Sequence, residues 1–363
     1  PPSEIAVHQD GRVTTLEAKC SLDGAVPYEL LSGGALSAHG RTCPEMGERV
    51  HVSYSSSAAP YVRVDTFKAD SWNLKKSVGV NVECPTMVHD CALTRNYVVV
   101  LDFPLTIRST RLLQNQFPVE YEPGYGARIG LLPRNADSDT TSWFECHKPG
   151  VILHTVNAFE TDDQVILQVL KSEPDTTKGY LSDYSPSFLC EYTLDLKTGS
   201  VQESCLNGND IIEFPVLPET STGRPTSHVY SSSVRAIGGP LKVLQQPTTG
   251  ILLGGITKHS LDQNDFERGR CIDRFTLDEH WYGVTEPTVV PKKGGEGEYV
   301  LMIATRVPEG VDIMDIKDDT LTSQIILLDG DCLSEGPVWT RKLPYHLNYG
   351  LHSTFLDWEK LLP

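Results

Sequence analysis

Short runs of apolar, β-branched and aromatic residues recur from one end of the chain to the other, and turn residues such as Asp, Gly and Pro bound them. Runs of this length and composition are typical of β-strands. Many are followed directly by a turn signal, as in Leu-Asp-Leu-Lys-Thr-Gly at 194–199. The pattern predicts strands at 50–54, 61–67, 97–103, 165–170, 188–196, 251–256, 299–306 and 324–329.

Helical periodicity is scarce by comparison. The best candidate is 108–117, where Leu112, Leu113 and Phe117 follow near-helical spacing. Because strands do not alternate with helices, the pattern disfavours a doubly wound parallel sheet. Many short strands favour an all-β sandwich, barrel or propeller, and for 363 residues a propeller is the most economical single domain.

Composition bounds the class of protein further. With 39% apolar and 22% charged residues, the chain has the means to fold around a core. Asp and Glu outnumber Lys and Arg by 48 to 31, a net charge of -17 that no basic block offsets, so nucleic acid is not an expected partner. The longest apolar stretches, 97–101 and 299–304, fall far short of the roughly 18 residues that span a bilayer.

The nine cysteines are scattered, and none forms a Cys-x-x-Cys pair. A zinc ribbon or a redox motif is therefore not expected, and we predict reduced, buried thiols. The chain has no Asn-x-Ser/Thr sequon, which agrees with an intracellular location. The sequence does not decide the compartment, with the cytoplasm and the plastid both open.

Four of the eleven histidines stand out by their settings, because each follows a short apolar segment: His39, His89, His154 and His352. Each imidazole would then emerge at the inner end of a strand. A propeller converges its inner strands on one axis, so histidines far apart in the sequence can meet there. Periodicity alone leaves the ordinary alternative open, in which each is a surface histidine or a hydrogen-bonded core histidine.

The segments around these histidines resemble the carotenoid cleavage oxygenase family. Four of them, at 37–39, 87–97, 154–160 and 343–353, are similar to the four histidine motifs of that family, in the same order. The stretch Ala-Arg-Ile-Gly-Leu-Leu-Pro-Arg at 127–134 is similar to the family's sequence before the third histidine. The resemblance runs over nearly the whole chain.

Membership would imply one domain over residues 1–363, a seven-bladed β-propeller with Fe(II) on its axis. Carried over residue by residue, the resemblance assigns four imidazole ligands: His39, His89, His154 and His352. Neutral imidazoles suit Fe(II), and nearby carboxylates that accept the Nδ1–H protons orient the rings. Three glutamates in settings like those of the family are expected in that role: Glu213, Glu286 and Glu4.

The implied activity is an Fe(II)-dependent dioxygenase that uses O2 to cleave a conjugated C=C bond of a carotenoid or apocarotenoid, giving two carbonyl products. A stilbene-cleaving dioxygenase and a retinoid isomerase share the same type of site and remain alternatives. A non-catalytic propeller that binds a hydrophobic ligand also remains open, because Ser-Ala-His-Gly-Arg at 37–41 replaces the Thr-Ala-His-Pro-Lys of many members.

Two further expectations follow from the resemblance. Leu112, Leu113 and Phe117 fall where family members carry an apolar patch that contacts membranes, with an ordinary packed amphipathic turn as the alternative. Family members are also longer, mostly before the first histidine, whereas His39 comes early here. We therefore expect that the propeller is incomplete at its N-terminus and presents strand edges prone to pairing.

Overall fold

The computed structural model divides the chain into two compact units, each described here by itself. The first comprises Pro1–Leu167, Tyr192–Gln202 and Thr222–Arg224, and the second comprises Gln168–Glu191, Glu203–Ser221 and Pro225–Pro363. The residues that the structure describes are 4–8, 12–17, 35–174, 185–206, 208, 210–235, 252–294, 296–309, 320–347, 350 and 352–355.

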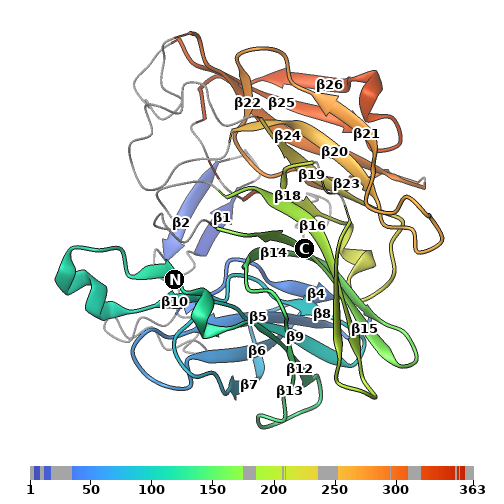
Figure 1. Cartoon of the computed structure of the whole chain (residues 1–363). Helices are drawn as coiled ribbons and strands as arrows, with labels where there is room; N and C mark the ends of the chain where they lie inside the picture. The colour runs from blue at the N-terminus through green and yellow to red at the C-terminus, as the bar shows by residue number, and fades with distance from the viewer. Residues whose placement is uncertain are drawn as a thin grey trace. The chain divides into compact units, whose positions relative to one another are not determined.

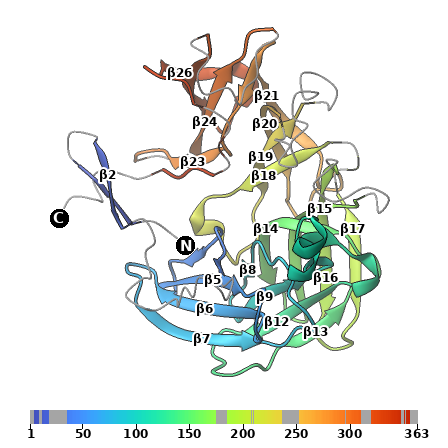
Figure 2. The same cartoon turned by 90° about the vertical axis from the view of Figure 1, so that its left-hand side faces the viewer.

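The first sheet of the first unit is antiparallel (Figure 1). Its strand order is β3 (Ala35–Leu36), β5 (Glu48–Tyr54), β6 (Val62–Lys68) and β7 (Leu74–Val80), with β4 (Arg41–Cys43) paired to β5. Strands β5, β6 and β7 run side by side (Figure 2). Apolar residues alternate along them, which is the period of a strand with one face on the core.

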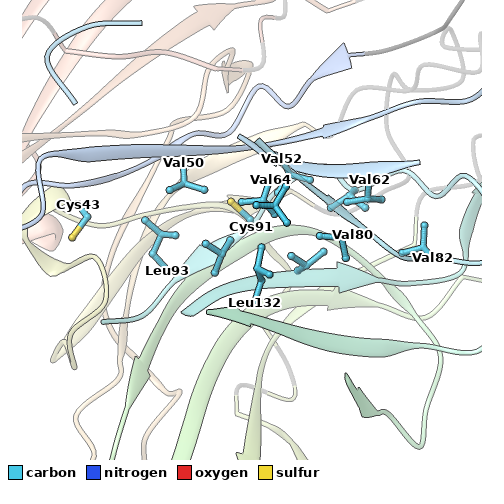
Figure 3. Packing of buried hydrophobic residues seen from close by; sticks show 14 residues of the cluster. Cys43, Val50, Val52, Val62, Val64, Val80, Val82, Cys91, Leu93 and Leu132 are labelled. Carbon is cyan, nitrogen blue, oxygen red and sulfur yellow. The ribbon is translucent and has the colours of Figure 1, made fainter. Parts of the chain in front are cut away.

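A second sheet of this unit has the order β13 (Ser142–Glu145), β12 (Arg128–Pro133), β9 (Tyr97–Asp102) and β8 (Ala92–Leu93). Valines of the first sheet pack with residues of this sheet and its flanks in one apolar cluster, which Figure 3 shows with Val52 and Val64 close to Cys91. Most side chains in the cluster are fully buried. Burial of a valine side chain is worth about 1.5–3 kcal/mol, so this cluster is a main source of stability for the unit.

Two hairpins and a four-stranded sheet account for the other strands up to residue 205. The hairpins are β1 (Glu4–Val7) with β2 (Val13–Glu17), and β10 (Leu105–Ile107) with β11 (Val119–Tyr121). The sheet has the order β14 (Val151–Glu160), β15 (Gln164–Ser172), β16 (Ser187–Asp195) and β17 (Val201–Cys205).

The second unit contains a nine-stranded antiparallel sheet. Its main path is β18 (Ile212–Val216), β19 (His228–Val234), β20 (Leu253–Ser260), β22 (Trp281–Gly283), β24 (Glu298–Arg306), β25 (Thr322–Asp329) and β26 (Pro337–Lys342). Off this path, β21 (Cys271–Thr276) pairs with β20, and β23 (Thr288–Pro291) pairs with β24. Tyr230, Ile256 and Met302 belong to one of its apolar clusters, and all three are fully buried.

The helical elements in the described ranges are 3-10 turns: η1 (Ser109–Gln114), η2 (Pro123–Tyr125), η3 (Glu219–Ser221) and η5 (Leu333–Glu335). The candidate helix at 108–117 is therefore a 3-10 turn. It ends at Asn115, whose φ of 55° places it in the left-handed region that terminates helices. Within the described part of the chain, none of the helical turns has the length and apolar character that crossing a membrane requires.

The all-β prediction is confirmed. The described sheets are open and none closes on itself, so the number of propeller blades and the single-domain organisation stay predictions. The eight cysteines in the described ranges are free, as predicted, but only Cys43, Cys91 and Cys190 are buried. Cys20 lies outside the described residues.

Candidate metal centre

Three of the four singled-out histidines meet in the first unit. His39 lies between β3 and β4, His89 precedes β8, and His154 lies within β14. Strand β8 contacts both β4 and β14 (Figure 1). The ring centroid of His39 lies 4.8 Å from that of His89 and 4.9 Å from that of His154. The centroids of His89 and His154 are 5.3 Å apart. Residues more than 100 positions apart in sequence (39 and 154) thus form one cluster.

The nitrogen positions of this cluster fit a bound metal ion. The Nε2 atoms of His39 and His89 are 3.1 Å apart, and the ligand atoms of the three rings lie within 4.8 Å of one another. Metal–imidazole bonds are about 2.1 Å long, so two ligand nitrogens at right angles on one ion lie about 3.0 Å apart. Imidazole donors suit zinc, copper, iron and nickel. The donor set and the spacing therefore suit a first-row transition metal.

The backbone around His39 is fixed by Ser37. The Ser37 hydroxyl donates to the carbonyl of His89 and accepts from the backbone N–H of His39 at 3.2 Å. The Ser37 carbonyl lies 3.2 Å from Nδ1 of the buried His51. One short side chain thereby joins the loops that carry the first two histidines.

A buried carboxylate, Asp90, lies next to His89. Burial raises the pKa of Asp90, but the Arg41 guanidinium, His39 and hydrogen bonds from Thr155 and Arg41 outweigh it, and the pKa falls to about 2. Asp90 is therefore ionised at neutral pH, and the charge of the Arg41 guanidinium beside it balances its negative charge. Neither Asp90 nor Arg41 was predicted as a site residue, although each lies within two positions of a motif histidine.

His352 is held in the second unit by Glu286. Its Nδ1 lies 3.0 Å from one carboxylate oxygen of Glu286, and the other oxygen accepts from the backbone N–H of Ser353 at 3.0 Å. A neutral imidazole that donates from Nδ1 presents its lone pair at Nε2, the tautomer that binds a metal. The Phe214 ring meets the His352 ring edge-on, with centroids 5.8 Å apart.

The other two predicted glutamates have different surroundings. Glu213 is buried at the start of β18, where it accepts from the Ser187 hydroxyl and, at 3.2 Å, from the backbone N–H of Phe214. Phe214 has a φ of 55°, an uncommon backbone conformation for a bulky residue, and such positions concentrate at functional sites. The backbone of Glu4 begins β1, and its side chain lies outside the described residues.

A second group of ligand-type side chains lies in the second unit, comprising Asp210, His259 and Cys271. Nε2 of the buried His259 is 3.2 Å from the Asp210 carboxylate, but Arg274 also pairs with that carboxylate at 2.8 Å. Burial lowers the pKa of His259, with Asp210 opposing the shift. Because a cation already pairs with Asp210, this group is an internal ion-pair network.

Comparison with known proteins places the chain in a family. Residues 5–357 match the model of the RPE65 family, described as retinal pigment epithelial membrane protein. The chain belongs to this family, which is also the carotenoid cleavage oxygenase family, so the resemblance seen in the motifs is confirmed.

Two curated relatives illustrate the similarity. The chain is 26% identical to carotenoid 9,10(9',10')-cleavage dioxygenase 1 of Phaseolus vulgaris, over 99% of this chain and 63% of the relative. It is 24% identical to the chromoplastic zeaxanthin 7,8(7',8')-cleavage dioxygenase of Crocus sativus, over 92% of this chain and 85% of the relative. The chain therefore spans a little under two thirds of the length of the bean relative.

Solved structures share the fold. A lignostilbene dioxygenase of Pseudomonas brassicacearum superposes with a TM-score of 0.73 at 21% identity, over 94% of this chain and 68% of the other. A cobalt-substituted ACO of Synechocystis gives a TM-score of 0.72 at 21% identity, covering 95% of this chain and 68% of the other. At this level of identity the similarity concerns the fold alone.

Proposed function

We propose that this protein is an Fe(II)-dependent dioxygenase that cleaves a conjugated C=C bond of a carotenoid or apocarotenoid with O2. Each carbon of the cleaved bond gains one oxygen atom, so the products are two carbonyl compounds. The observation that carries the proposal is the cluster of His39, His89 and His154 in a chain whose curated relatives are named carotenoid cleavage dioxygenases.

The proposed iron ligands are the three clustered histidines and His352, on the axis of a seven-bladed propeller. When bound, Fe(II) supplies the electron-donating centre that O2 chemistry requires. The protein's own part is to hold neutral imidazoles with their Nε2 lone pairs available. The contact between Glu286 and His352 Nδ1 supports that role for Glu286, and Glu213 and Glu4 are proposed as the corresponding carboxylates for other ligands.

The partners implied by this function are a hydrophobic polyene and O2. A polyene offers few polar groups for recognition, so burial in an apolar passage must select the bond that is cleaved. A stilbene-type substrate is the second candidate, because a lignostilbene dioxygenase shares the fold. Two alternatives to cleavage remain to be tested. One is isomerisation of a retinoid, and the other is binding of a hydrophobic ligand without catalysis.

Aerobic incubation of the Fe(II)-loaded protein with a panel of carotenoids, apocarotenoids and stilbenes tests the function. We expect two carbonyl products from a carotenoid or apocarotenoid, detected by mass spectrometry, with oxygen from labelled O2 in both. Products from stilbenes alone would move the assignment to the second candidate. Isomerised substrate without label would contradict cleavage.

Anaerobic titration with Fe(II) separates an enzyme from a binding scaffold. We expect one tightly bound iron per chain, lost in His154→Ala because one imidazole donor is removed. His147→Ala is the control, since His147 is exposed and lies outside the cluster. If the unaltered protein binds no iron, the proposal of a metal-dependent enzyme is wrong.

We also propose that η1 contacts membranes to collect a lipid-soluble substrate. The exposed fractions of Leu112, Leu113 and Phe117 are 58%, 89% and 54%. These values support a membrane-facing patch over a packed amphipathic turn, because a packed turn would bury its apolar side chains.

A further inference from the structure

The residues next to the three clustered histidines converge on one another. Arg41 comes two positions after His39, Asp90 one position after His89, and Thr155 one position after His154. All three belong to the first unit. The Asp90 side chain has 0% of its surface exposed, whereas Arg41 is a quarter exposed.

The Asp90 carboxylate is the centre of these contacts. Its Oδ2 pairs with Nη2 of Arg41 at 2.5 Å and accepts from the backbone N–H of Thr155 at 2.8 Å. The Thr155 hydroxyl lies 2.9 Å from the same oxygen. Oδ1 of Asp90 accepts from the backbone N–H of Cys91 at 2.7 Å.

Arg41 closes the network by bridging the other two segments. Its Nη2 donates to the Thr155 carbonyl and to the Thr155 hydroxyl, both at 2.8 Å, and its Nε donates to the Cys91 carbonyl at 3.0 Å. The Arg41 guanidinium therefore bonds to the backbone that follows His89 and to the backbone that follows His154. Because Arg41 itself follows His39 in the sequence, this one side chain connects all three histidine segments. Charge-assisted hydrogen bonds of this kind, shielded from water, are stronger and more directional than neutral ones.

The location of the network explains how it can act on the imidazoles. Thr155 follows His154 within β14, where adjacent side chains point to opposite faces. The hydrogen bonds of its hydroxyl are thus made on the face away from the His154 ring. Fixing the residue beside each histidine fixes the Cα–Cβ directions of the three rings relative to one another, before any metal binds.

We propose that Asp90, Arg41 and Thr155 act as positioning residues that hold His39, His89 and His154 as a preformed three-imidazole site. This inference rests on the proposed metal centre but adds a role for residues that do not bind the metal. Partners outside the ligand set orient ligands and commonly change metal affinity about 10- to 100-fold.

The first unit offers a matched control for a purely structural role. Asp102 also has 0% of its side chain exposed, and it pairs with Arg128, which is 24% exposed, at 2.8 Å. Asp102 accepts from the Tyr125 hydroxyl at 2.9 Å as well. Asp102 also accepts from the Thr86 hydroxyl at 3.4 Å, three positions before His89. None of its partners is next to a proposed ligand in the sequence, so Asp102→Asn removes an equally buried ion pair without removing a bond to the residues adjacent to the histidines.

Titration of the 363-residue chain with Co(II), followed by its visible absorption, tests the inference. We expect Asp90→Asn to weaken Co(II) binding about tenfold or more, and Asp102→Asn to change it less than about threefold. Thr155→Val should weaken binding, and Thr155→Ser should restore it because the hydroxyl returns. Equal effects of Asp90→Asn and Asp102→Asn, or equal binding by Thr155→Val and Thr155→Ser, would overturn the inference while leaving the proposed function intact.

Hydrogen exchange of the metal-free variants gives a readout that does not depend on metal binding. Asp90→Asn should raise deuterium uptake together in peptides covering 37–41, 87–92 and 152–157, and Asp102→Asn should not. Faster exchange confined to the peptide that contains residue 90 would refute the inference. If the unaltered protein binds neither Co(II) nor Fe(II), the proposed function fails. The exchange pattern still decides whether Asp90 holds the three histidine segments together. Thr155→Val is measured in parallel, in case Asp90→Asn does not fold.

Discussion

Gly40, between His39 and Arg41, shows how closely the surroundings of the site are packed. A Cβ atom built on Gly40 would lie 2.2 Å from Nε2 of His51 and 2.3 Å from its Cε1. The His51 ring is buried and stands tilted against Trp72, with centroids 5.5 Å apart, so it has little room to move. At this position a side chain would displace either the ring or the backbone that carries His39.

We therefore expect Gly40→Ala to lower the free energy of unfolding by ~1–3 kcal/mol, the usual cost of overpacking, and to weaken Co(II) binding. Urea denaturation and the Co(II) titration measure the two effects. Gly124→Ala is the control, because a Cβ there meets nothing within 4 Å. Equal stability and metal affinity of the two variants would contradict this account of Gly40.

An ion-pair network around the buried Glu48 contributes to the acid stability of the first unit. The Glu48 carboxylate binds Arg134 at 2.8 Å and Lys75 at 2.5 Å, and the Arg134 side chain is only 4% exposed. Burial raises the pKa of Glu48, but hydrogen bonds from the two cations lower it more, so the net pKa lies below the ordinary 4.5. A depressed carboxyl pKa adds stability above pH 4.5, and this contribution is lost as the pH falls through the folded-state pKa.

At pH 7, Glu48→Gln should destabilise the protein by ~3 kcal/mol, because Arg134 is left buried without its carboxylate. The difference from the unaltered protein should begin to shrink below pH 4.5 and vanish as the pH falls through the lower folded-state pKa, where Glu48 itself becomes protonated. Urea denaturation at several pH values measures both. Glu45→Gln removes an exposed pair with Arg224 and should have little effect. If the loss of unfolding free energy in Glu48→Gln does not depend on pH, the lowered pKa of Glu48 does not contribute to stability as described.

At the scale of elements, the strands that the sequence predicted correctly show either a continuous apolar run or an alternation of apolar and polar residues. The predictions at 61–67 and 299–306 correspond to β6 (Val62–Lys68) and β24 (Glu298–Arg306). For β14, which carries His154, the sequence indicated only a strand that ends at the histidine, because His, Thr and Asn interrupt the apolar run. In the structure these polar residues are buried as well, so burial there depends on partners from other elements.

The turn η1 is the element on which membrane contact depends. We expect Leu112→Glu/Leu113→Glu to reduce flotation of the protein with phosphatidylcholine liposomes, since each glutamate adds a charge that resists transfer from water. Phe266→Glu is the control, because Phe266 is fully exposed in a different part of the chain. Unchanged flotation of the double variant would argue for an ordinary surface turn.

At the scale of the whole molecule, metal binding should be linked to stability. A metal that binds only the folded chain stabilises it by about 2.7 kcal/mol when the free metal is 100 times its Kd. We expect Co(II) to raise the melting temperature of the unaltered protein and of His147→Ala, and to leave His154→Ala nearly unchanged. Differential scanning calorimetry with and without Co(II) measures this. An equal rise in all three proteins would indicate metal binding away from the cluster.

The amino-acid sequence by itself determined the all-β class, the position of most strong strands and the family, because these depend on local alternation and on short motifs. It also identified the four histidines by the apolar segments before them. Only the tertiary structure decided that Arg41, Asp90 and Thr155 meet, since the partners of Arg41 lie 49 and 114 residues away in the chain. Such contacts leave no periodic signal in the sequence. Each involves a single buried polar residue, and the partners that satisfy its hydrogen bonds come close to it only when the chain folds.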